Sequence, residues 1–265
     1  MPNHPNQHAS PSALSFRAAL ICAAALVMTP ATWAQQRPAE NAASSWSLGV
    51  LASTETSPYQ GADDNRRLLP LVAFENQYVR WAGPVLDLKL PSSGALSFTL
   101  RARYEDAGYE ASDSATLAGM AERKSSIWLG ARASWQHTLG QLSAEWLADA
   151  ASHSGGQQVR LVAEKPLSYG RLVLAPRVAL VWQDSDYVDY YFGVRSGEAT
   201  AGRAAYAGKA TTNTELGLRA IYGLDAQQSV FMDLHVTALG SAIKNSPLVD
   251  RSSVAGVRVG YAYRF

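Results

Sequence analysis

The sequence predicts an all-β protein, a single antiparallel transmembrane β-barrel of about twelve strands. Apolar and polar residues alternate along segments of roughly ten residues, which suits strands with one face in lipid. The connections between these segments are alternately short and long, and the last segment ends on an aromatic residue. Ten or fourteen strands are the alternatives, because the stretch over residues 68–90 holds either two strands or four.

The N-terminal segment predicts export. A positive charge precedes an apolar run from Ala18 to Met28, which is too short for a membrane-spanning helix, and small residues follow it up to Ala34. This order is typical of a secretory signal peptide. We predict that residues 1–34 are the signal and that residues 35–265 form the barrel domain. The one cysteine, Cys22, lies in the apolar run, so we expect no disulfide in the mature protein.

The composition argues against nucleic acid as a partner. The formal net charge is +1 at pH 7, whereas nucleic-acid binding requires a clear basic surplus. Beyond the signal, no apolar run is long enough for a membrane-spanning helix. We therefore expect the chain to cross the membrane as strands.

Alternating segments in the first half of the chain predict strands. They cover residues 45–53, 68–75, 77–82, 85–90 and 95–105. Residues 57–65, the Gly83-Pro84 pair and the polar stretch 106–124 are rich in turn formers and predict the connections between them.

Further alternating segments predict the strands of the second half. They cover residues 127–136, 142–149, 159–164, 172–183, 187–194, 211–222, 227–238 and 253–265, of which 187–194 is short and aromatic. Short turns are predicted near Gly140, at residues 166–170 and near Leu224. Long loops are predicted near Asp113, Ser154, Gly202 and Asn245. This sorting is typical of barrels with short periplasmic turns and long outer loops.

Four short stretches resemble the MipA/OmpV family of outer-membrane proteins. They are Ser57 to Asp64 with Leu69-Pro70, Tyr190 to Val194 with Glu198, Ala199 and Tyr206, Ser246 to Val249, and Gly260 to Phe265. Residues 92–124 show little match. The resemblance implies an outer-membrane β-barrel that acts as a scaffold or adhesin and not as an enzyme. It also implies two protein partners, a murein transglycosylase and a penicillin-binding protein, which one family member is proposed to link.

The polar faces of the predicted strands carry charges of both signs. They are Arg101, Arg103, Glu105, Arg132, Glu145, Asp149, Arg160, Glu164, Arg177, Glu215, Arg219, Asp233, His235 and Arg258. Mixed signs in a narrow lumen predict salt bridges that fill the barrel, because unpaired charges there are costly. The alternative is a charged pore lining, as in a small-solute channel. We favour packing, because a barrel of about twelve strands lies between filled small barrels and open porins.

Neither a catalytic site nor a cofactor site is predicted. A third hypothesis is an outer-membrane lipid or ester hydrolase, since Asp233 and His235 share one strand face. Residues two apart on any strand share a face, however, and a G-x-S-x-G motif is absent from the sequence. The histidines are scattered, which argues against a metal site. We therefore predict no enzymatic activity, no metal and no cofactor.

The final segment predicts an assembly signal. Val259, Tyr261, Tyr263 and Phe265 alternate with small or charged residues and end the chain on an aromatic side chain. We expect this strand to be recognised by the barrel assembly machinery and to place the protein among the lipids of the outer membrane.

Overall fold

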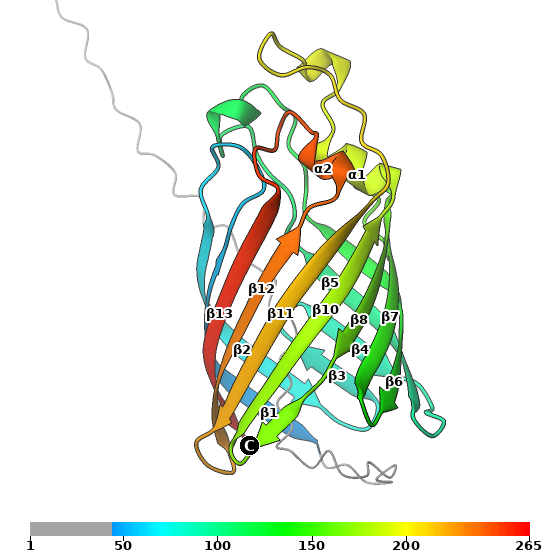
Figure 1. The fold of residues 1–265 in the computed structure, drawn as a ribbon, viewed down its shortest axis with the longest axis vertical. Coiled ribbons are helices and arrows are strands. Elements are labelled where there is room, and N and C mark those ends of the chain that lie inside the picture. The colour runs from blue at the N-terminus through cyan, green and yellow to red at the C-terminus, as the bar shows by residue number, and fades with distance from the viewer. Residues whose placement is uncertain (1–43) are drawn as a thin grey trace, which may run out of the picture.

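The computed structural model describes residues 44–265, and the predicted signal peptide lies outside these residues. One antiparallel sheet curls into a closed barrel (Figure 1). Its strands are β1 (Ser45–Glu55), β2 (Asn65–Glu75), β3 (Val79–Ala82), β4 (Val85–Lys89), β5 (Leu96–Glu105), β6 (Ser126–His137), β7 (Gly140–Asp149), β8 (Gln157–Glu164), β9 (Leu167–Tyr169), β10 (Leu172–Gln183), β11 (Thr211–Gly223), β12 (Gln228–Ala238) and β13 (Ser253–Arg264).

The barrel closes between its first and last strands. β1 pairs with β13 from Ser47↔Arg264 to Glu55↔Gly256. Apart from β8 and β9, which do not pair with each other, consecutive strands along the chain are paired. β8 and the short β9 both pair with β10 and flank Pro166, so together they form one strand of a twelve-strand barrel. The predicted fold class is confirmed. The interpretation of residues 166–170 as a turn is wrong for Leu167–Tyr169, because the chain reverses through Gly170 and Arg171, and Gly170 has a φ of 59°.

The predicted strand over residues 187–194 is also wrong, because Ser185–Phe192 forms the helix α1. The Asp184 side chain caps it by accepting a hydrogen bond from the Tyr187 amide at 2.9 Å. Tyr187, Val188, Tyr191 and Phe192 are buried, and this spacing lies on one face of a helix. The N-cap at Asp184 and the tertiary packing of the buried face outweigh the strand preference of aromatic residues. A second short helix, α2 (Ser241–Lys244), lies in the loop before β13.

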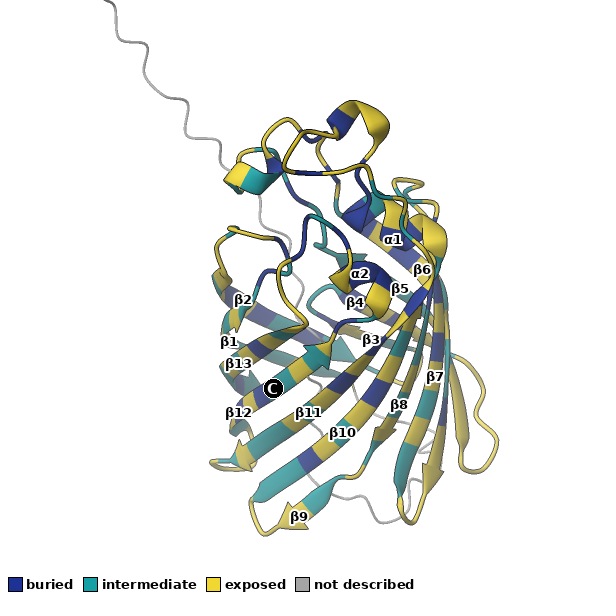
Figure 2. Ribbon diagram, turned by 45° about the horizontal axis from the view of Figure 1, so that its top comes forward, coloured by how far each residue is buried: buried dark blue, intermediate teal, exposed yellow. Residues whose placement is uncertain are grey.

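The outer surface of the barrel is apolar. Figure 2 shows exposed positions alternating with less exposed ones along β10 and β11. The exposed positions carry large apolar side chains, among them Leu48, Leu100, Leu129, Leu180 and Val259. This pattern is that of a wall whose outer face lies in lipid. No helix in residues 44–265 is long and apolar enough to cross a membrane.

The connections are sorted between the two rims, as predicted. Figure 1 shows the long loops, α1 and α2 at one end of the barrel and the C-terminus at the other. The turns at the second rim include the tight reversals at Gly140 and Gly170. We call this rim periplasmic and the long-loop rim outer. Between β3 and β4 the chain reverses on the outer side through Gly83 and Pro84 alone.

Candidate functional site: a charged lumen beneath a folded cap

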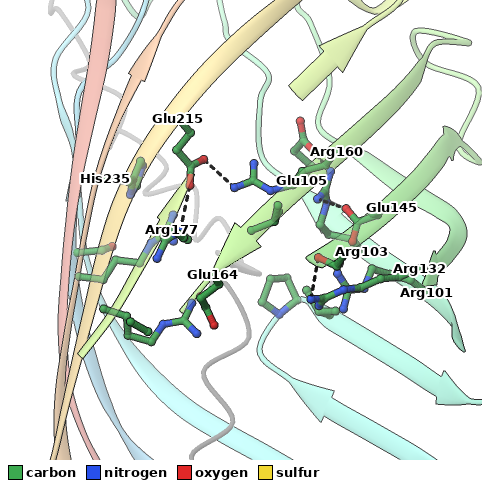
Figure 3. Close-up of a pocket in the computed structure, with 18 of the residues that line it drawn as sticks. Arg101, Arg103, Glu105, Arg132, Glu145, Arg160, Glu164, Arg177, Glu215 and His235 are labelled. Carbon is green, nitrogen blue, oxygen red and sulfur yellow. Dashed lines mark hydrogen bonds and ion pairs between the residues drawn. The ribbon is translucent and has the colours of Figure 1, made fainter. Parts of the chain in front are cut away.

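The inward faces of the strands carry the charged residues singled out in the sequence. Figure 3 shows arginines and carboxylates projecting into the lumen from opposite walls. Twelve of these residues line one large cavity: Arg101, Arg103, Glu105, Arg132, Glu145, Arg160, Glu164, Arg177, Glu215, Arg219, His235 and Arg258. The other two are Asp233, which is buried beneath two arginines, and Asp149, which lies at the outer rim.

One ion-pair cluster covers the wall formed by β4, β5 and β7. Arg101 binds both carboxylate oxygens of Asp87 at 2.7 Å and also contacts Glu145. Arg103 reaches Glu145 at 3.0 Å and Glu105 at 2.8 Å. Asp87 was missed in the sequence, although it lies between the outward-facing Leu86 and Leu88 and alternation places it inside.

A second cluster covers β8, β10, β11 and β12. The Arg177 guanidinium donates hydrogen bonds of 2.7 and 2.9 Å to the two carboxylate oxygens of Asp233. It also donates a hydrogen bond to Glu215 at 3.2 Å. Arg160 also donates to Glu215, at 2.8 Å, and Arg219 donates to Asp233, at 3.1 Å. Each carboxylate is therefore shared between two arginines, which offsets the cost of burying it.

Three other predicted residues have their hydrogen-bond partners outside these clusters. Arg132 donates to Ser143 at 3.2 Å, and Arg258 to Glu55, also at 3.2 Å. Asp149 accepts hydrogen bonds from Ser126 and from the Ser154 amide, and so ties the outer rim together.

The residues of the hydrolase hypothesis do not form a catalytic pair. The closest approach between Asp233 and His235 is 3.9 Å, beyond hydrogen-bond distance, and both oxygens of Asp233 are held by Arg177. Within residues 44–265, no group of three His, Cys, Asp or Glu side chains is close enough to hold a metal ion.

The cavity runs the length of the lumen and has a volume of about 3160 Å³. Residues of the periplasmic turns line its lower end, among them Gly170, Asp225 and Gln227. Tyr59, Phe192 and Ile243, which belong to the outer loops, line its upper end. The cavity thus extends from the periplasmic turns to the outer loops.

The outer loops fold into a second hydrophobic core, which we call the cap. It comprises loops 56–64, 106–125, 184–210 and 239–252, which include α1 and α2. Its core, with two residues from the strand tops, consists of Tyr59, Tyr109, Leu117, Met120, Trp128, Leu147, Tyr187, Val188, Tyr191, Phe192, Val194, Leu239, Ala242, Ile243, Leu248 and Val249. Figure 2 shows this buried material above the barrel mouth. The cap lies over the outer end of the lumen.

A buried ion pair joins two loops of the cap. Arg123 binds both oxygens of Glu198, at 2.8 and 3.0 Å, and its side chain is only 1% exposed. Glu198 also accepts from the amides of Ala121 and Arg195, each at 3.0 Å. Burial opposes ionisation, but the hydrogen bonds from Arg123 and the two amides prevail and lower the pKa of Glu198 to about 2. Glu198 is therefore ionised at neutral pH.

Three of the stretches that carry the family resemblance meet inside the cap. Tyr59 donates its hydroxyl to the Tyr191 carbonyl at 3.1 Å and stacks on Phe192 with ring centroids 5.6 Å apart. Ser246 donates to the Phe192 carbonyl at 2.6 Å. The Gln60 amide donates to the Leu248 carbonyl at 2.8 Å. Segments almost two hundred residues apart in sequence therefore form one packed unit.

The fourth stretch closes the barrel. Its outward-facing aromatic residues lie at the periplasmic rim, where the rings of Tyr263 and Phe265 are 4.8 Å apart. The Phe265 amide donates to the Trp46 carbonyl at 2.9 Å, and its side chain is 65% exposed. The terminal aromatic ring is thus available to another molecule.

Comparison with known proteins identifies the family. The family model of the MltA-interacting protein MipA matches residues 48–265. The outer membrane protein YiaT of Escherichia coli K12 is 26% identical over 228 residues, which cover 84% of this chain and 92% of YiaT. The MltA-interacting protein of the same strain is 25% identical over 225 residues, which cover 83% and 90%.

Among solved structures, the NanC porin matches with a TM-score of 0.43 and 8% identity, over 82% of this chain and 98% of that chain. The match of the family model extends from β1 through the cap to the C-terminal residue. The resemblance predicted from the four stretches is confirmed, and the chain is an outer-membrane β-barrel that belongs to the MltA-interacting protein (MipA) family.

Proposed function

We propose that the protein is a closed, non-enzymatic scaffold of the outer membrane that binds a murein-processing enzyme on its periplasmic side. The observation that carries this proposal is the cap. A packed core and a buried ion pair lie over the outer mouth, and the cavity of the lumen reaches the periplasmic turns. Such a barrel offers surface to periplasmic partners without offering solutes a path across the membrane.

The choice of partner rests on the family. A relative that matches most of the chain is named MltA-interacting protein, and the family resemblance implies a murein transglycosylase as a partner. We propose a murein transglycosylase as the direct partner and a penicillin-binding protein as the second enzyme that the scaffold links to it. The paired charges of the lumen support the barrel in this role, since ion pairs that join neighbouring strands stabilise its shape.

A conductance measurement distinguishes the scaffold hypothesis from the hypothesis of a small-solute channel. In planar bilayers, the wild-type protein is expected to show no stable conductance steps. Arg123→Ala should open the cap and produce steps, because it leaves the Glu198 carboxylate buried without its main partner, at a cost of about 3–5 kcal/mol. Reproducible ohmic steps from the wild type would favour the channel.

A binding measurement tests the partner. The full barrel in lipid nanodiscs is expected to bind purified murein transglycosylase from the same cells, and the cap variant Arg123→Ala should bind equally well, because the cap faces away from the periplasm. Loss of binding on opening the cap would favour a function of the outer loops, such as adhesion. No binding by either form would remove the transglycosylase as the partner.

The C-terminal strand supports a separate proposal about assembly. Deleting Phe265 is expected to reduce the amount of barrel inserted in the outer membrane, because the exposed terminal ring is then unavailable to the assembly machinery. Once folded, the truncated barrel should unfold at a urea concentration close to that of the wild type, since residues 47–55 still pair with β13. An unchanged yield would contradict this role.

A further inference from the structure

Arg132 is an arginine of the lumen wall that is bonded to no carboxylate. It lies near the middle of β6, and its partly buried side chain lines the central cavity. Within residues 44–265, its guanidinium makes one hydrogen bond, from Nη2 to the Ser143 hydroxyl at 3.2 Å, and no ion pair. None of its unbonded nitrogens is buried, so the remaining N–H groups face the cavity.

The strand register explains why Arg132 lacks an acidic partner. Glu145 lies directly across from it on β7. Both oxygens of Glu145 are already occupied, because Arg101 contacts one and Arg103 donates to the other at 3.0 Å. Arg132 turns instead toward Ser143, which lies two residues nearer the periplasmic rim on β7. A neutral hydroxyl thus takes the place that a carboxylate would fill.

The charges around Arg132 do not neutralise it. Figure 3 shows Arg101 and Arg132 side by side on this wall. The charges that act most strongly on Arg132 are two of each sign, those of Arg101, Glu145, Arg80 and Asp87. Because these four balance in sign, the positive charge of Arg132 itself remains. A guanidinium of this kind, with N–H groups directed into a water-filled space, is suited to binding a carboxylate or a phosphate.

Three serine side chains form a row beside Arg132, on its periplasmic side. Register aligns Ser97 with Ser134 and Ser134 with Ser143, across β5, β6 and β7. All three side chains line the cavity. A hydroxyl group both donates and accepts hydrogen bonds, so the row offers partners for the hydroxyl groups of a solute. We call Ser97, Ser134 and Ser143 the serine row.

Amide side chains lie between the serine row and the periplasmic rim. Gln136 and Gln141 face each other in register on β6 and β7, and both line the cavity. Glu164 follows beside Gln141 on β8. The cavity continues from here to the periplasmic turns. The wall formed by β6 and β7 therefore presents neutral hydrogen-bonding groups from the rim up to Arg132.

We propose that Arg132 and the serine row bind a small hydroxylated anion that enters the lumen from the periplasmic side. Its carboxylate or phosphate group accepts hydrogen bonds from the Arg132 guanidinium, and its hydroxyl groups exchange hydrogen bonds with Ser97 and Ser134. The site gives the lumen a ligand of its own. It depends neither on the scaffold function nor on the cap.

Equilibrium dialysis of the full-length protein in lipid nanodiscs tests the site. The probe is radiolabelled gluconate, a hydroxylated carboxylate, and sorbitol has the same carbon chain without the charge. Gluconate is expected to bind, and sorbitol to bind about tenfold more weakly, because sorbitol gives the guanidinium no anionic group. Sorbitol 6-phosphate carries a phosphate instead, and the anion that competes better identifies the preferred group. Binding of neither anion, or equal binding of gluconate and sorbitol, would overturn the proposal.

Arg132→Met is expected to weaken gluconate binding about tenfold, since it removes the charged hydrogen-bond donors. Arg132→Lys keeps the charge and should bind with intermediate affinity. The matched control is Arg258→Met, which removes the same charge from the lumen on β13. Arg258 also lines the cavity, but it is bonded to Glu55 at 3.2 Å. This control should bind gluconate like the wild type. Equal losses from the two methionine variants would overturn the proposal, because the net charge of the lumen would then explain binding.

Urea unfolding separates binding from a structural role. Arg132→Met should unfold at the same urea concentration as the wild type, because no carboxylate loses its partner. A large loss of stability with unchanged gluconate binding would make Arg132 a structural residue and overturn the proposal. The double variant Ser97→Ala/Ser134→Ala leaves Arg132 in place and should weaken gluconate binding several-fold. Unchanged binding by this double variant would overturn the role of the serine row.

Discussion

Arg177→Met is expected to lower the free energy of unfolding of the barrel by about 3–5 kcal/mol, because it leaves two buried carboxylates without their shared cation. The Asp233 side chain is 2% exposed and receives two bonds from Arg177. Arg219, which is 22% exposed and bonded to Asp233 at 3.1 Å, replaces only part of this interaction. Urea unfolding in phospholipid vesicles, followed by gel mobility, measures the change.

Arg160→Met is the matched control for this prediction. It removes an arginine from the same cluster, but Arg160 is 28% exposed and makes one bond, to Glu215. Its loss should cost less than about 1 kcal/mol. The double variant Arg177→Met/Asp233→Leu should recover much of the stability, because the buried charge is removed with its partner. Equal losses from the two single variants would show that the cluster acts only through its net charge.

Glu198→Gln is expected to loosen the cap at neutral pH and to abolish its sensitivity to acid. The pKa of Glu198 is about 2 in the folded cap, against an ordinary value of 4.5. A carboxyl group with a lowered pKa contributes its full stabilisation above its ordinary pKa and loses it as the pH falls toward the folded pKa. The wild-type cap should therefore weaken as the pH falls from about 4.5 toward about 2.

Hydrogen exchange in loop 106–125 as a function of pH measures this effect. The exposed Glu122 lies next to Arg123 in the same loop, so Glu122→Gln removes a comparable charge without touching the buried pair. That control should behave like the wild type. A cap that responds to acid equally in the Glu198→Gln variant would show that other carboxylates control its opening.

The strands of this barrel are largely readable from the sequence, because lipid and lumen impose opposite preferences on successive residues. Alternation alone placed Arg101, Glu145 and Arg177 on the inner face, where the structure has them. Alternation does not determine which side chains these charged residues form ion pairs with. The ion pair between Arg101 and Asp87 depends on the register between β4 and β5, and no local sequence pattern encodes that register.

The cap could not be predicted in the same way. Arg123 and Glu198 are 75 residues apart, and neither lies in a periodic segment. The strand predicted over residues 187–194 failed for a related reason. Tyr187, Tyr191 and Phe192 favour a strand in isolation, but packing against Trp128 and Tyr59 selects the helix that Asp184 caps.

The sequence by itself determined the barrel, its orientation and the sorting of charge inward and apolar side chains outward, since each follows from the solvent that a residue meets. Only the tertiary structure decided that a folded cap lies over the outer mouth and that the upper half of β2 has no strand beside it, on the side away from β1, in the described sheet. Both features depend on contacts between distant segments. The cap needs four loops to share one core, and the upper half of β2 lacks a neighbour because Gly83 and Pro84 turn the chain before β3 reaches the outer rim.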